Sequence, residues 1–126
     1  MGEDIQRKYQ NELDNLKTAQ KELQTALSTR QQLDGQLTEN EMVKHELSLL
    51  PAEGKVFKSV GPVLIKTEVI EAKQNVSKRI DYITKEMKKV EDLIGSLEKK
   101  QDNARGALQK LQHQLQQAQV KAALHA

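Results

Sequence analysis

Histidines and carboxylates are the residues of this chain that could catalyse a reaction or bind a metal ion. His45, His113 and His125 share no ligand spacing, and no carboxylates cluster around any of them. Asp81 and Glu86 fall on the outer face of a helical pattern, where acidic side chains serve solvation. The sequence therefore predicts no enzyme, no cofactor and no metal site.

The segment KVFKSVGPVLIK, residues 55–66, favours a different chemistry, which is association through apolar side chains. It is the only stretch with the composition of β-strands, and Gly61-Pro62 at its centre indicates a tight turn between two strands. Two strands alone are marginal in water and leave two unpaired edges, so we expect strands of other chains to complete the hairpin. The candidate association residues are Val56, Phe57, Val60, Gly61, Val63, Leu64 and Ile65.

Long helices must position this hairpin, because the heptad repeat of a coiled coil runs on both sides of it. We call the a and d positions of the repeat the seam. Nine of thirteen seam positions between Ile5 and Leu47 are apolar; the exceptions are Glu12, Arg30, Asn40 and Lys44. Between Val76 and Ala122, thirteen of fourteen are apolar, Gln101 being the exception.

The expected fold class is mainly α, a long antiparallel two-helix coiled coil with one β-hairpin inserted between the helices. We predict a single domain over residues 1–126, with helix 1 at about 4–49, the hairpin at about 55–66 and helix 2 at about 68–122. Pro51 is expected to end the first helix, and the Thr67 hydroxyl to cap the second. If facing residues sum to about 117, Leu16 lies opposite Gln101 and Leu115 projects beyond Ile5.

Composition excludes several other classes of protein. Aromatic residues make up 2% and charged residues 30%, too few large side chains for an ordinary globular core. The net charge of +2 comes from interspersed charges, which argues against nucleic-acid binding. There is no cysteine, no apolar run long enough for a membrane and no secretory signal, so we expect a soluble, cytoplasmic protein.

Apolar residues also gather where the helix ends should meet, away from the hairpin. They are either ordinary seam residues at frayed ends or a mobile apolar surface that catches exposed hydrophobic segments of other proteins. These candidate client-binding residues, which we call the tip residues, are Ile5, Tyr9, Leu13, Leu115, Val120 and Leu124.

Two motifs carry a family resemblance. The strand segment VFKSVGPVLIK, followed by Glu71-Ala72 and by KRIDYI at residues 78–83, resembles the β-class prefoldin subunits, and most closely a eukaryotic branch of that class. The upstream stretch QLTEN at residues 36–40 matches that branch too. The motifs cover roughly residues 30–97, whereas the flanks match by their heptads alone.

The resemblance implies a heterohexamer of α- and β-class prefoldin subunits, in which the hairpins complete an intermolecular β-barrel and the coiled coils hang from it. It further implies an ATP-independent holdase, with unfolded actin and tubulin as clients and the cytosolic chaperonin as recipient. Two other readings stay open. The chain could be a structural coiled-coil adaptor, or a subunit of a prefoldin-like assembly that does not itself hold clients.

Overall fold

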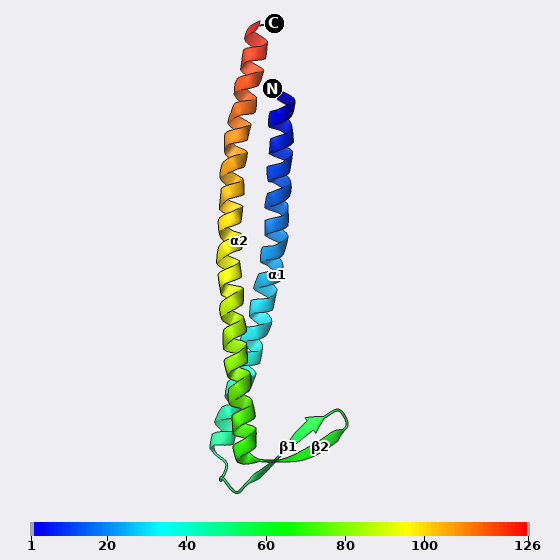
Figure 1. Cartoon of the computed structure of the whole chain (residues 1–126), viewed down its shortest axis with the longest axis vertical. Coiled ribbons are helices and arrows are strands. Elements are labelled where there is room, and N and C mark those ends of the chain that lie inside the picture. The colour runs from blue at the N-terminus through cyan, green and yellow to red at the C-terminus, as the bar shows by residue number, and fades with distance from the viewer. Residues whose placement is uncertain (1, 126) are drawn as a thin grey trace. The chain divides into compact units, whose positions relative to one another are not determined.

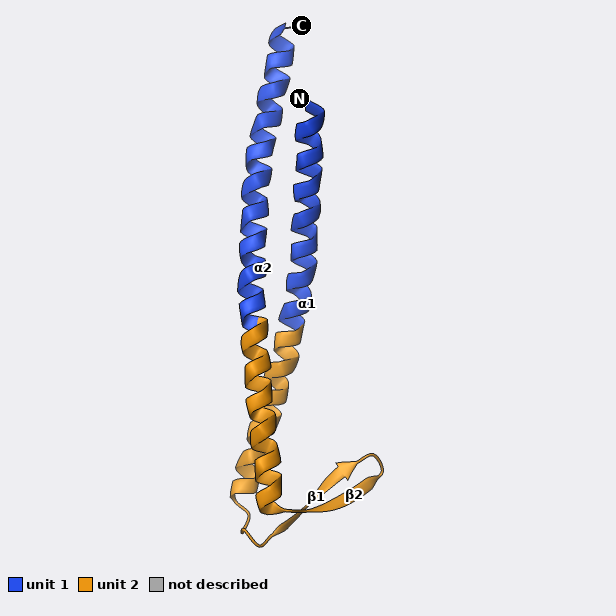
Figure 2. Cartoon of the chain, in the orientation of Figure 1, with its two compact units in different colours: residues 1–28, 91–126 blue, residues 29–90 orange. Residues whose placement is uncertain are grey.

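The structure is a computed structural model, and it describes residues 2–125. Four elements follow one another along the chain: α1 (Gly2–Ser48), β1 (Lys55–Val60), β2 (Val63–Glu68) and α2 (Val69–His125) (Figure 1). The chain divides into two compact units, which are coloured separately in Figure 2. Of the described residues, 2–28 and 91–125 belong to unit 1, and 29–90 belong to unit 2, which contains the hairpin.

The predicted seam accounts for the buried side chains of both units except Val69. From Val76 to Ala118 every predicted seam position of α2 is buried or half-buried, and only Ala122 is exposed. In α1 the exposed seam positions are Arg30 and Lys44, both charged. Charged side chains lose hydration when buried, so these two remain at the surface where the repeat would place an apolar residue, whereas Glu12 is half-buried.

Unit 1 consists of the first part of α1 and the last part of α2, which run side by side in opposite directions (Figure 2). Its most buried side chains combine small and large residues across the two helices. They are Ala19, Ala26, Ile94, Leu97 and Ala104.

Unit 2 holds the hairpin between the end of α1 and the start of α2. Helix α1 ends at Ser48, and the amides of Leu49 and Leu50 still bond the carbonyls of Glu46 and Leu47, both at 3.2 Å. Pro51 follows, and its carbonyl accepts a bond of 2.9 Å from the Gly54 amide. This short turn leads directly into β1.

The element boundaries differ from the predicted ones in three places. Helix α1 already begins at Gly2, and α2 continues to His125. Strand β2 extends to Glu68, so Thr67 is paired with Val56 in the hairpin and does not serve as the predicted helix cap. Instead, the first amide of α2, at Val69, donates to the Gly54 carbonyl at 3.4 Å. A carbonyl of the preceding loop thus bonds one of the amides that a helix start leaves unpaired.

Candidate functional site

The hairpin pairs its strands in a single antiparallel register, from Lys55↔Glu68 at the open end to Val60↔Val63 at the turn. Gly61 and Pro62 form the two-residue loop, and Gly61 has a φ of 58°. A positive φ at the first central position is what a type II′ turn demands, and glycine adopts it without a steric penalty. Gly61 is therefore a residue of the turn, and the other six predicted association residues lie on the strands.

The register divides those six residues between two faces, because directly opposed residues point to the same side of a sheet. One face, which we call the wide apolar face, carries four apolar side chains: Val56, Val60, Val63 and Ile65. The opposite face carries Phe57 and Leu64, which are diagonal neighbours, among polar residues. A paired Lys55 and Glu68, 3.7 Å apart, close its open end.

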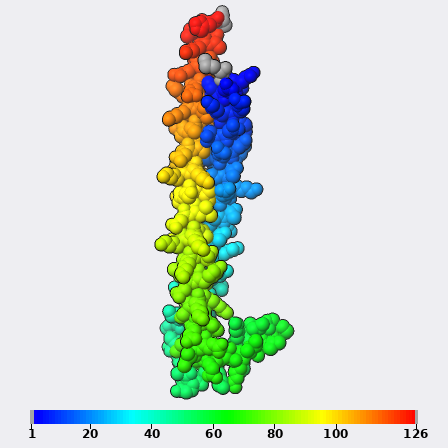
Figure 3. Space-filling view, in the orientation of Figure 1, coloured from blue at the N-terminus to red at the C-terminus, as the bar shows by residue number. Residues whose placement is uncertain are grey.

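Both faces of the hairpin are open to solvent within this chain. Phe57 is 64% exposed and Leu64 67%, whereas Val56 alone among the six is half-buried. Figure 3 shows the hairpin standing out from the helices of unit 2. Two exposed apolar faces and two unpaired edges are the features of a strand pair that associates with other chains.

Sequence reasoning missed further apolar residues of unit 2 close to the hairpin in the chain. Leu49, in the turn after α1, is 72% exposed, and Ile70, in the first turn of α2, is 58% exposed. Both are large apolar residues outside the heptad seam, and this mismatch is the sequence signal that could have identified them as exposed. They enlarge the apolar surface of unit 2 that another chain could cover.

The helix ends of unit 1 give a mixed outcome for the tip residues. Ile5, Tyr9, Leu13 and Leu115 are half-buried, so they belong to the packing between the helices. Val120, at 58% exposure, and Leu124, at 78%, are the tip residues that are open to solvent. Of the predicted tip, these two on α2 could contact another protein without rearrangement of the helix pair.

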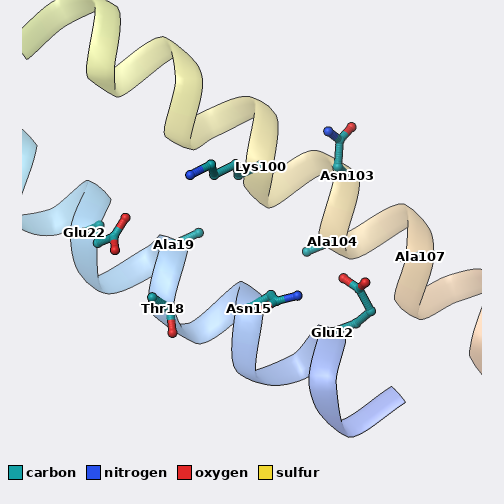
Figure 4. Close-up of a pocket in the computed structure, with 9 residues that line it drawn as sticks. All are labelled: Glu12, Asn15, Thr18, Ala19, Glu22, Lys100, Asn103, Ala104 and Ala107. Carbon is teal, nitrogen blue, oxygen red and sulfur yellow. The ribbon is translucent and has the colours of Figure 1, made fainter. Parts of the chain in front are cut away.

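The half-burial of Leu115 can be compared with the predicted register, in which this residue projects beyond Ile5 without a partner. Ala19 and Ala104, whose numbers add up to 123, line one groove together with Asn15 and Asn103, whose numbers add up to 118 (Figure 4). Lys8 and Gln114 likewise share a second groove. These sums lie between about one and six residues above the predicted 117, and neither groove contains Leu16 or Gln101, so their pairing stays a prediction. Leu115 follows Gln114 in the chain and is half-buried, so it lies near the first turns of α1.

The groove in Figure 4 has small residues, Ala19, Ala104 and Ala107, where the helices approach each other. Its rim is polar and includes Glu12, Asn15 and Lys100. Alanine side chains are small, so they leave space between the two helices that leucine side chains would fill, and this explains the groove.

No group of three or more His, Asp or Glu side chains within residues 2–125 could hold a metal ion. In the same range, no helix has both the length and the apolar character needed to cross a membrane.

Comparisons with known proteins agree with this arrangement. Residues 10–115 match the family model described as Prefoldin subunit. The chain is 46% identical over 120 residues to prefoldin subunit 6 of Mus musculus, covering 95% of this chain and 94% of that protein. It is 40% identical over 117 residues to prefoldin subunit 6 of Arabidopsis thaliana, with coverage of 93% and 91%.

A solved structure shares the architecture. The crystal structure of the prefoldin beta subunit from Thermococcus strain KS-1 matches with a TM-score of 0.53 and 26% identity, covering 87% of this chain and 90% of that one. The predicted fold class, two long helices with a β-hairpin between them, is thereby confirmed.

Proposed function

Because this chain belongs to the prefoldin subunit family, we propose that it acts as a β-class subunit of a heterohexameric holdase. In this role it binds unfolded proteins without ATP and passes them to the cytosolic chaperonin. The clients that the family resemblance suggests are actin and tubulin. The hairpin associates with the other prefoldin subunits, and the exposed end of α2 contacts the client.

The single observation that carries the proposal is the exposure of apolar side chains on both faces of the hairpin. Burying one such side chain contributes about 1.5–3 kcal/mol. Association itself costs about 4–15 kcal/mol in lost translational and rotational freedom, so several of these side chains must be buried together. A barrel shared with neighbouring subunits buries the wide apolar face and pairs the free strand edges at once.

Client holding rests on Val120 and Leu124, which are exposed at the end of α2. Apolar contact is non-directional, so it accepts many unfolded sequences. One pair of side chains binds weakly, and several subunits on one platform raise the overall affinity by avidity. A weak contact at each subunit also lets the client leave quickly when the recipient takes it.

The test compares two variants of this chain that add the same number of negative charges. Each variant carries a tag, and the complex that contains it is purified through that tag. Phe57→Asp, Val60→Asp and Leu64→Asp together place charges on both hairpin faces. The control, Gln24→Glu, Gln32→Glu and Gln109→Glu, places the same charge on exposed helix positions. We expect the hairpin variant to lose the native mass of the complex and its suppression of actin aggregation, while its helical circular dichroism is retained.

The control variant should keep both properties. A hairpin variant of full native mass would refute the role of the hairpin in assembly. If the unmodified chain were recovered as a homodimer that does not delay client aggregation, the coiled-coil adaptor would be the better explanation.

A further inference from the structure

Unit 2 contains a groove between α1 and α2 that neither the hairpin nor the tip residues use. It is lined by Gln36 and Asn40 of α1 and by Lys78, Arg79, Tyr82 and Ile83 of α2. Tyr82 is 65% exposed, and Ile83 is buried. We propose that this groove, which we call the basic groove, binds an acidic peptide segment of a partner protein.

The groove exists because Asn40 occupies a seam position where the heptad would place an apolar residue. The side-chain amide of Asn40 turns back along α1 and donates a 2.7 Å bond to the Gln36 carbonyl. Its side chain therefore does not fill the space above Ile83 as a leucine would. The amide oxygen of Asn40 has two lone pairs and can accept a bond from a peptide N–H.

The charge of the groove selects the ligand. Lys78 and Arg79 are exposed, and neither forms a salt bridge within residues 2–125. No carboxylate lines the groove. Glu86, one turn beyond Tyr82 on α2, is engaged by Lys89 at 3.3 Å. Two unpaired cations can bind carboxylates, and the planar Arg79 guanidinium can hold one through two parallel bonds.

The aromatic ring of Tyr82 adds an apolar contact beside these two cations. An exposed tyrosine offers a flat surface at little cost in conformational entropy, which is why tyrosines are common at binding sites. The matching ligand is a segment with two or more glutamates or aspartates around one apolar side chain. A nucleic acid fits less well, because two cations neutralise few phosphates and the chain as a whole carries a net charge of only +2.

The test measures fluorescence anisotropy of a short labelled peptide that has several glutamates and one leucine, added to the complex that contains this chain. We expect Lys78→Gln with Arg79→Gln to weaken peptide binding about tenfold or more, since hydrogen bonds to charged groups are among the strong ones. Tyr82→Ala should weaken it about threefold. The matched control, Lys88→Gln with Lys99→Gln, removes two exposed cations from the same helix outside the groove, leaves the pair of Lys89 and Glu86 intact, and should change binding less than about twofold.

Three further measurements keep the outcome unambiguous. Replacing the glutamates of the peptide with glutamine should abolish binding, and raising the salt from about 0.05 to about 0.5 M should weaken it. Native mass checks that each variant is assembled, and the substituted side chains are exposed, so their loss leaves the fold intact. An equal loss in both lysine-containing variants, or equal binding of the glutamine peptide, would overturn the proposal. Displacement of the peptide by lower concentrations of a single-stranded oligonucleotide would assign the groove to nucleic acid instead.

Discussion

Gly54 is the residue on which the junction of unit 2 depends. Its amide donates to Pro51, its carbonyl accepts from Val69, and the Val69 side chain beside it is fully buried. A β-carbon on Gly54 would lie 3.0 Å from the Pro51 carbonyl oxygen and 3.3 Å from a methyl of Val69. The turn that connects α1 to the hairpin is therefore closed tightly around a residue with no side chain.

We predict that Gly54→Ala lowers the free energy of unfolding by about 1–3 kcal/mol, because a backbone oxygen must move to admit the methyl group. Gly95→Ala is the matched control. It adds the same methyl group within α2, where nothing lies within 4 Å, and should raise the stability by up to about 1 kcal/mol. Urea unfolding followed by circular dichroism measures both. Equal effects of the two substitutions would contradict the tight closure at Gly54.

At the scale of elements, α2 shows that the heptad position of a leucine decides whether its side chain is buried or exposed. Leu97 lies on the seam and is 1% exposed, whereas Leu93, one turn earlier on the same helix, is 49% exposed. Both belong to unit 1. Leucines one turn apart thus have different environments, because Leu97 lies on the seam whereas Leu93 lies beside it, at the edge of the apolar face of α2.

We predict that Leu97→Ala destabilises the chain by about 2–5 kcal/mol, the range for a buried leucine that leaves a cavity. Leu93→Ala should cost less than about 1 kcal/mol, since little apolar surface is uncovered. The midpoint of urea unfolding, at one protein concentration, distinguishes the two variants. A Leu93→Ala variant as unstable as Leu97→Ala would mean that α2 is rotated about its axis relative to the structure.

At the scale of the whole molecule, the chain exposes apolar side chains in both of its compact units. Unit 2 exposes the hairpin, and unit 1 exposes Val120 and Leu124. The two surfaces differ in kind. The hairpin offers unpaired strand edges as well as apolar side chains and so suits a fixed partner, whereas a helix end offers side chains alone and suits variable ones.

We predict that a photo-crosslinking amino acid placed at Leu124 captures unfolded actin when it is illuminated within the complex. The same amino acid at Glu98, which is exposed in the middle of α2, should capture several-fold less. Since capture reports on this chain alone, client contacts of other subunits do not mask the result. Capture that is as strong at Glu98 as at Leu124 would place client contact away from the helix end.

Several features of this protein follow from its sequence because they depend on local patterns. The heptads identified the buried residues of α2 from Val76 to Ala118, since a repeat of 3.5 residues returns the same helix face to the seam. Gly61-Pro62 identified the turn, because the positive φ found at Gly61 suits glycine above all. The motifs around residues 55–66 and 78–83 identified the family, which the match over residues 10–115 confirms.

Other features required the tertiary structure, because they depend on how distant segments meet. Seam still faces seam when one helix is displaced along the other by a heptad, so the periodicity alone could not determine the register, that is, which residues of the two helices face each other. The tip residues depend on that register, and four of the six proved half-buried. The start of α2 also depends on a distant group, since Gly54 bonds Val69 while Thr67 remains in β2. Composition and periodicity thus determined the elements, and the resemblance of two motifs indicated the family, whereas side-chain packing across the seam decided which apolar residues are left exposed.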